Sequence, residues 1–140
     1  MALPSHLTLQ LATADRSLVN EQVDEVEIPG ADGYFGVLPG HAPLLALLGA
    51  GELWYRQSQE KHYLSLAFGF AEVGPDRVSI LAQIAEKPEE IDIARAEAAK
   101  RRAEERLSKP TMDMDFERAR ISVVKSLIRL QVATRARTRA

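Results

Sequence analysis

The position of the glycines is the feature of this 140-residue sequence that most constrains its fold. All eight glycines precede residue 75, and beyond Pro88 only Pro110 interrupts the chain. Glycine permits tight turns and positive φ angles, and it weakens helix interiors. We therefore expect a turn-rich β domain over residues 1–87 and a helical domain over residues 88–140.

Short alternating stretches in the first part predict β-strands. In His6–Leu11 the leucines face one side and the polar residues the other, which is the period of a half-buried strand. A register break within residues 23–28 suggests a bulge. Many short strands at this spacing indicate a sandwich or barrel. The other expected strands are 34–38, 52–56, 62–67, 70–73 and 77–82, with hairpin connections at 57–61 and 74–76.

The second part predicts two helices. The first begins near Pro88, runs to Leu107 and has a thin, alanine-rich apolar face. The second, capped by Asp113 or Asp115, has an apolar face wider than the first helix can cover, so we expect it to pack on a third body. Two stripes about 120° apart form this face: Phe116, Ala119, Val123, Leu127 and Leu130, and Ile121, Val124, Ile128 and Val132. Opposite lies a mostly basic stripe of Arg118, Ser122, Lys125 and Arg129.

Composition and charge narrow the possible functions. The absence of cysteine excludes disulfides, thiolate metal sites and cysteine nucleophiles. No signal-peptide pattern occurs at the start, and the longest near-apolar run, residues 42–50, is too short to span a bilayer, so we expect only indirect contact with a membrane. Residues 1–88 hold 5 Lys/Arg and 11 Asp/Glu, whereas residues 89–140 hold 13 and 9. A basic arm on an acidic body predicts an acidic partner for the arm.

The sequence offers little for catalysis. The three histidines are far apart without metal-ligand spacing, and neither a nucleophile elbow nor a phosphate-binding loop occurs. Residues 30–45, dense in Gly and Pro, are either a sandwich corner or a rigid loop pair that docks on a partner. Asp92 and Arg95 can pair on one helix face. Alternatively, Arg95, Arg102, Lys125 and Arg129 would converge on a polyphosphate if the hairpin closes.

Three segments resemble the epsilon subunit of bacterial F-type ATP synthases. Residues 36–45, GVLPGHAPLL, are similar to the family signature GILPGHAPL. Residues 68–82 resemble its GGFxEV…VTILA stretch, and residues 96–104 resemble its first carboxyl-terminal helix. The match runs in the same order and spacing over about residues 5–134. It implies an α+β fold: an amino-terminal ten-stranded β-sandwich followed by a carboxyl-terminal two-helix antiparallel hairpin.

The resemblance implies a non-catalytic rotor subunit. The sandwich would bind the gamma subunit and the ring of c subunits, coupling proton translocation to ATP synthesis. The hairpin would inhibit ATP hydrolysis by extending into the alpha/beta ring. The implied location is peripheral, on the cytoplasmic face of the cell inner membrane. The implied rotor and c-ring contacts are Gly30, Asp32, Gly33, Tyr34, Gly36, Pro39, His41 and Pro43, with Tyr34 standing where a polar or acidic residue is common. The implied inhibitory contacts with beta are Arg118, Lys125 and Arg129.

The resemblance also implies ATP as a regulatory ligand, with no required cofactor and no metal. Residues 91–96, IDIARA, fit the I/L-D-x-x-R-A motif of members whose hairpin binds ATP. Lys125 stands where those members tend to have arginine; it keeps the charge but lacks the planar bidentate fork. Carried over residue by residue, the implied site is Glu86, Asp92, Arg95, Ala96, Arg102, Lys125 and Arg129.

Two rival functions use the same hairpin. A free-standing nucleotide-sensing adaptor would need no rotor. A nucleic-acid-binding tail would use Arg118, Arg120, Lys125, Arg129, Arg135, Arg137 and Arg139. The tail lacks aromatic residues for base stacking and follows an acidic body, so we expect no nucleic-acid partner.

Overall fold

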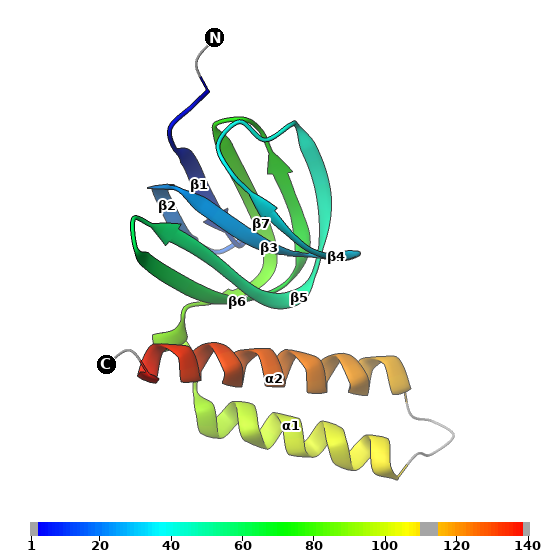
Figure 1. The fold of residues 1–140 in the computed structure, drawn as a ribbon. Coiled ribbons are helices and arrows are strands. Elements are labelled where there is room, and N and C mark those ends of the chain that lie inside the picture. The colour runs from blue at the N-terminus through cyan, green and yellow to red at the C-terminus, as the bar shows by residue number, and fades with distance from the viewer. Residues whose placement is uncertain (1–2, 110–114, 139–140) are drawn as a thin grey trace.

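The computed structural model describes residues 3–109 and 115–138. A β-sandwich forms one body, and two helices lie side by side beneath it (Figure 1). In chain order the elements are β1 (Leu7–Ala12), β2 (Ser17–Val23), β3 (Glu25–Gly30), β4 (Gly33–Val37), β5 (Leu44–Gln57), β6 (Glu60–Val73), β7 (Arg77–Glu86), the 3-10 turn η1 (Pro88–Glu90), α1 (Ile93–Ser108) and α2 (Phe116–Thr138).

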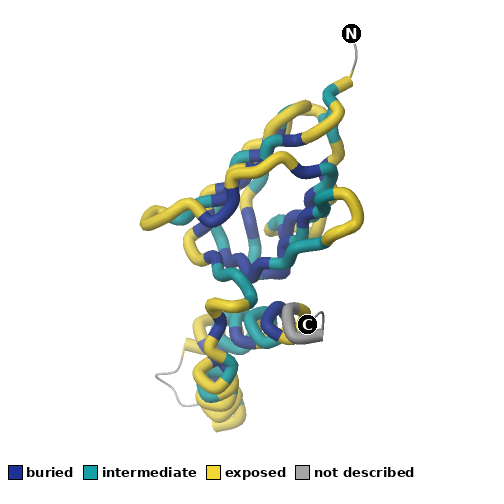
Figure 2. Tube along the Cα trace, turned by 90° about the vertical axis from the view of Figure 1, so that its left-hand side faces the viewer, coloured by how far each residue is buried: buried dark blue, intermediate teal, exposed yellow. Residues whose placement is uncertain are grey.

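The strands form one sheet that folds over on itself. Their order is β2-β1-β7-β6-β5-β3-β4, and of these neighbours only β1 and β7 run parallel. The Gln57 side chain at the end of β5 donates a 3.0 Å hydrogen bond to the carbonyl oxygen of Gln22, which brings β5 to the edge strand β2. Buried leucine, isoleucine and valine side chains fill the enclosed space. The dark blue segments of the trace in Figure 2 mark where buried residues lie along the chain.

Three long strands bend sharply, and each changes the side that faces the core. In β6 the core residues are Leu64 and Leu66 before the bend, but Ala71 and Val73 after it. Between them the backbone takes positive φ angles, 63° at Phe68 and 115° at Gly69. A side chain at position 69 would collide with the carbonyl oxygen of β7, so this bend requires glycine. The same change of face occurs in β5 and β7.

The fold class is confirmed, but the strand count differs. The structure contains seven continuous strands rather than ten. Counting the bent strands β5, β6 and β7 twice, once on each side of the bend, and the four short strands once gives ten. The difference therefore reflects where a bent strand is divided.

Some predicted strand limits were wrong. The register break within residues 23–28 is a change of strand at Asp24, because β2 pairs with β1 whereas β3 pairs with β4 and β5. Residues 62–67 and 70–73 form the single strand β6. Sequence patterns missed most of β2, and the apolar run at 42–50 proves to belong largely to β5.

The first helix begins later than predicted. After η1 the backbone remains extended at Ile91 and Asp92, and the Asp92 carboxylate accepts a hydrogen bond from the amide of Arg95 at 3.0 Å. Asp92 is thus the amino-terminal cap of α1. Asp115 accepts a 3.1 Å bond from the amide of Arg118 and caps α2 in the same way. The other predicted cap, Asp113, lies outside the described residues.

Helix α2 lies between the sandwich and α1. Its residues Val132 and Ala133 form a small buried cluster with Ile91, against which Tyr63 of β6 and Ile128 also pack. In α1 only Ala96 and Ala103 are buried among the described residues. The sequence predicted the basic stripe opposite the apolar face, but three of its members, Ser122, Lys125 and Arg129, face the sheet. Of the predicted apolar face, Ile128 and Val132 pack toward the sandwich, whereas Phe116, Val124 and Leu127 stay exposed.

Candidate functional site at the hairpin–sandwich interface

A row of polar residues crosses the face of the sheet that α2 covers. Glu52 of β5 pairs with Ser65 of β6, and Ser65 pairs with Glu86 of β7. Glu52 and Ser65 are buried, with 8 % and 4 % of their surface exposed. Because neighbouring strands are about 4.8 Å apart, the backbones at Glu52 and Glu86 lie about 10 Å from each other. We call these three residues the acidic row.

Each carboxylate of the acidic row meets one arginine of α2. Arg129 donates from Nη2 to Oε2 of Glu86 at 3.1 Å, and its Nε lies 2.7 Å from Oε1. Arg135 donates from Nε to Oε2 of Glu52 at 3.4 Å, with Nη2 3.3 Å from Oε1. In each pair the guanidinium faces both carboxylate oxygens, but only one contact per pair has hydrogen-bond geometry. The buried Nε of Arg129 is close to Oε1 of Glu86 and yet is not aligned to donate to it. The acidic partner of the basic arm is thus, in this conformation, the protein's own body.

Two aromatic rings complete the interface. The Lys125 ammonium lies 5.2 Å from the ring centre of Phe68, the residue at the bend of β6. The Arg135 guanidinium lies 4.9 Å from the ring centre of Tyr63. Cations over aromatic faces gain electrostatic energy, more so where water is partly excluded.

Three of the residues implied for ATP binding line one cavity between the sheet and the hairpin. This cavity, of about 190 Å³, has Glu86, Lys125 and Arg129 in its wall, together with Ser65 and Ser126. Its volume is below the roughly 300 Å³ expected of a pocket for a drug-sized ligand. It could therefore hold part of a nucleotide, such as phosphate oxygens, and the rest would have to extend outside.

The other implied ATP-binding residues lie elsewhere on α1. Asp92 is occupied as a helix cap, and Ala96 is buried. Arg95 is exposed, and the exposed Arg102 lines a shallow surface depression of α1 with Glu105, Arg106 and Lys109. Of the implied contacts with beta, Arg118 is exposed, whereas Arg129 is only 25 % exposed and engaged with Glu86.

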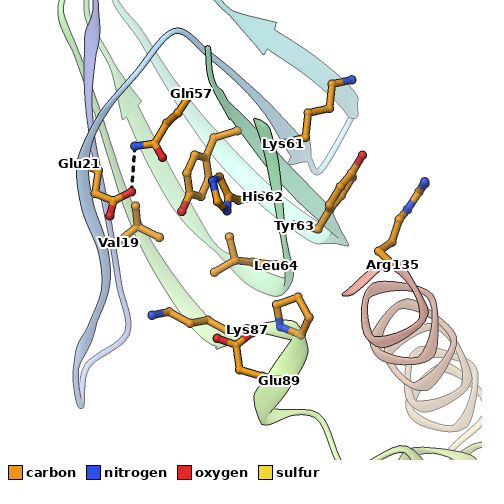
Figure 3. Close-up of a pocket in the computed structure, with 12 residues that line it drawn as sticks. Val19, Glu21, Gln57, Lys61, His62, Tyr63, Leu64, Lys87, Glu89 and Arg135 are labelled. Atoms are coloured by element: carbon orange, nitrogen blue, oxygen red, sulfur yellow. Dashed lines mark hydrogen bonds between the residues drawn. The ribbon is translucent and has the colours of Figure 1, made fainter. Parts of the chain in front are cut away.

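A second cavity, of about 400 Å³, lies where the sandwich, η1 and the end of α2 meet (Figure 3). Tyr55 and His62 stack at its back with ring centres 4.9 Å apart, and burial raises the pKa of Tyr55 to about 12. Gln57 donates to Glu21 at 3.0 Å along one wall. The wall carries both signs of charge, with Lys61, Lys87 and Arg135 against Glu21 and Glu89, so it favours no single class of ligand.

The implied rotor residues form two groups. Gly30, Asp32, Gly33, Tyr34 and Gly36 belong to the β3–β4 hairpin, whose turn amide at Ala31 donates to the carbonyl oxygen of Leu47 at 2.8 Å. Pro39, His41 and Pro43 lie in the loop before β5, which a 2.7 Å bond from Gly40 to Pro75 holds beside the β6–β7 turn. Tyr34 is 55 % exposed, yet its hydroxyl accepts a bond from the amide of Glu52 at 3.1 Å.

An exposed apolar surface adjoins both groups and was not predicted. Leu47, Phe70 and Leu81 are direct cross-strand neighbours on β5, β6 and β7, and all three are exposed. Leu45, 71 % exposed, stands two residues before Leu47 on the same side of the strand. We call Leu45, Leu47, Phe70 and Leu81 the apolar row. The sequence signal was available, because residues that alternate with the core residues Ala71 and Ile80 must face outward.

An ion pair fixes the start of the hairpin to the sandwich. Arg16, in the β1–β2 turn, donates from Nη1 to Oε1 of Glu90 in η1 at 2.9 Å. This hydrogen bond lowers the pKa of Glu90, and the same bond raises the pKa of Arg16.

Two classes of site are missing from the part of the chain that the structure describes. None of its helices is both long and apolar enough to cross a membrane. Across the same residues, no group of three His, Asp or Glu side chains is placed to hold a metal ion.

A β-sandwich joined to a docked two-helix hairpin, with an exposed apolar row on the sandwich, defines a two-domain class of protein. The β-sandwich domain model of the ATP synthase delta/epsilon chain matches residues 6–88, and the long α-helix domain model of the same chain matches residues 89–134. The chain belongs to this family, which confirms the resemblance seen in the sequence. It is accordingly a non-catalytic stalk subunit of an ATP synthase.

Individual relatives agree with this assignment. The ATP synthase epsilon chain of Solibacter usitatus is 47 % identical over 131 residues, covering 94 % of this chain and 98 % of the relative. That of Koribacter versatilis is 54 % identical over 98 residues, 70 % of this chain and 69 % of the relative. A chain in the Euglena gracilis mitochondrial ATP synthase, solved with OSCP, F1 and c-ring, superposes with a TM-score of 0.82 at 26 % identity, covering 96 % of this chain and 84 % of that one.

Proposed function

We propose that this subunit sits in the rotor of an F-type ATP synthase, on the cytoplasmic face of the inner membrane, and that its sandwich binds the gamma subunit and the c-ring. The observation that carries the proposal is the apolar row, three of whose four side chains form a continuous exposed line across three strands. Exposed apolar patches of this kind favour protein–protein contact. The β3–β4 hairpin beside the row supplies the proposed c-ring contact.

The role of the hairpin in this proposal is to regulate ATP hydrolysis. In the closed state described here, Arg129 is bound to Glu86 and is therefore withheld from any other acidic partner. Extension of the hairpin would free Arg118, Lys125 and Arg129 for the beta subunit. ATP is the proposed regulatory ligand, and its phosphates would be held by Lys125 and Arg129 at the smaller cavity. The nucleotide would replace Glu86 as the partner of Arg129 and would reach α1 where Ala99 lines the same cavity. Because it would bind only the closed state, it would oppose inhibition.

The gamma contact can be tested directly. Leu47→Asp, at a side chain that is 72 % exposed, should leave folding intact and weaken binding of purified gamma at least tenfold, because it places a charge in an apolar contact. Gln59→Asp, at the exposed β5–β6 turn, is the matched charge control and should bind normally. Normal gamma binding by Leu47→Asp would remove the apolar row from the proposal.

The regulatory role is tested by removing the hairpin. A chain that ends after Pro88 should still bind gamma, while any inhibition of ATP hydrolysis in the reconstituted complex disappears. Separately, calorimetric titration of the isolated subunit with ATP should show weaker binding for Arg129→Ala. An unchanged titration would remove the nucleotide from the proposal without affecting the rotor role.

A further inference from the structure

The two arginine–carboxylate pairs at the interface differ in what surrounds them. Arg129 and Glu86 share the 190 Å³ cavity with Lys125, so a nucleotide held there would compete with Glu86 for Arg129. Arg135 instead lines the 400 Å³ cavity near the carboxyl-terminal end of α2, more than one helical turn away. A ligand bound at Lys125 and Arg129 therefore leaves the Arg135 pair in place.

The carboxylate of the Arg135 pair is better shielded from water than that of the Arg129 pair. The Glu52 side chain is only 10 % exposed, compared with 21 % for Glu86. Tyr63 is the ring that the guanidinium of Arg135 covers, and Tyr63 also packs against the buried cluster of Val132 and Ala133. Arg135 thus joins the acidic row to the apolar contact that holds α2. If Arg135 is removed, Glu52 keeps its buried position under the closed hairpin but loses this partner, which penalises the closed state alone.

We propose that Glu52 and Arg135 form a ligand-independent latch, which sets how often the hairpin opens before any nucleotide binds. The latch deepens the regulatory part of the proposed function, because it identifies the residues that determine the resting state. The family motifs point to neither residue, and the sequence named Arg135 only as part of a basic tail. Arg135 acts as a positioning residue for α2, and Glu52 on the sandwich accepts its hydrogen bond.

The test uses a thiol reporter in the full-length isolated subunit. The chain contains no cysteine, and Ser126 of α2 is 3 % exposed at the interface, so Ser126→Cys places a single thiol that reagents reach only when the hairpin opens. When closing is fast relative to reaction, the labelling rate is proportional to the open fraction. Ala71→Cys, in the sandwich core, reports global unfolding in a parallel series.

Arg135→Ala and Glu52→Gln should each raise the labelling rate at position 126 about tenfold, the loss expected for one charged hydrogen-bonded pair. The double variant should label no faster than the faster single variant, because both changes remove the same contact. The labelling rate at position 71 should not change. Arg135→Lys, which keeps the charge without the fork, should fall between Arg135→Ala and the parent chain.

The matched control is another ion pair of the same helix. Arg120 and Glu117 lie 3.0 Å apart within α2, and both are about two-thirds exposed. Arg120→Ala should leave the labelling rate at position 126 unchanged. The latch is overturned if Arg135→Ala labels no faster than Arg120→Ala, or if the effects of Glu52→Gln and Arg135→Ala multiply in the double variant. Since the assay needs neither gamma nor ATP, failure of the rotor proposal would not affect it.

Discussion

The sandwich and the helical hairpin are held together in different ways. The sandwich encloses one large cluster of buried leucine, valine, isoleucine and tyrosine side chains, contributed by all seven strands. Among the described residues, the cluster that docks the hairpin has only three buried members, Ile91, Val132 and Ala133. Apolar burial is the main source of folding free energy, so the sandwich is expected to be stable by itself while the hairpin is held marginally.

The difference shows how one small chain combines a fixed part with a movable part. Most of the apolar residues of the sandwich are buried in its own interior. The hairpin is attached through a few apolar contacts and two arginine–carboxylate pairs, which water can replace when the hairpin leaves. An interface of this kind can be broken without exposing a large core, which is what a regulatory arm requires.

The largest expected effect is on the unfolding free energy of the sandwich, and it comes from a change in its core. Leu53→Ala, at a side chain with no exposed surface, should lower the free energy of unfolding by about 2–5 kcal/mol, because it leaves a cavity in the sandwich. Urea denaturation followed by the fluorescence of Trp54 measures it. Leu47→Ala, at an exposed leucine of the same strand, is the control and should change stability by less than about 0.5 kcal/mol. Equal losses in both variants would contradict the division into core and surface.

A smaller change should act on the hairpin alone. Val132→Ala removes two methyl groups from a position with no exposed surface and should weaken docking by about 1.5 kcal/mol. We expect faster labelling of the Ser126→Cys thiol and an unchanged urea transition of the sandwich. Val124→Ala, the same substitution at a 40 % exposed position of α2, should do neither. A lowered sandwich transition in Val132→Ala would mean that the two parts unfold as one.

The cap of α1 should matter less. Asp92→Ala removes the acceptor for the amide of Arg95 and should destabilise α1 by about 1 kcal/mol, seen as lost helical circular dichroism on mild heating. Asp92→Asn keeps a capping oxygen and should behave like the parent. This variant also isolates the cap from nucleotide binding: if Asp92→Asn loses ATP affinity while it keeps the helix, Asp92 has a second role.

The smallest expected effect is a pH dependence in the linker. The folded-state pKa of Glu90 is lowered by its bond to Arg16, so this contact stabilises the docked linker above the unfolded pKa near 4.5 and is lost as pH falls through the folded value. Because both side chains are partly exposed and solvent screens the pair, we expect this contact to contribute the least of those tested here. Glu90→Gln should remove this acid-dependent part of Ser126→Cys labelling, whereas Glu89→Gln should retain it.

Sequence patterns predicted local elements well and their limits less well. Alternating leucines gave β1, and the alanine-rich stretch gave α1. The bends of β5, β6 and β7 could not be predicted from the sequence, because they depend on a positive φ at Phe68 and on which strands lie opposite it. Asp92 was weighed as a pairing partner of the Arg95 side chain, yet it caps the helix through the Arg95 backbone. Spacing alone cannot distinguish these two contacts.

The site was only partly accessible from the sequence. The motif resemblance singled out Glu86, Lys125 and Arg129, which the fold brings into one cavity wall. It passed over Glu52 and Arg135, which are 83 residues apart and belong to no local pattern. The nucleotide and rotor assignments remain predictions for the experiments above.

The sequence by itself determined the two-part division, the family and the acidic body with its basic arm, because glycine placement, residue order and charge are properties of the chain alone. Only the tertiary structure decided which carboxylate meets which arginine, and that the basic side of α2 faces the chain's own sandwich. The physical reason is that these contacts join strands and a helix far apart in sequence. Sheet registry and the docking of α2 fix their geometry, and neither is encoded in any short stretch of residues.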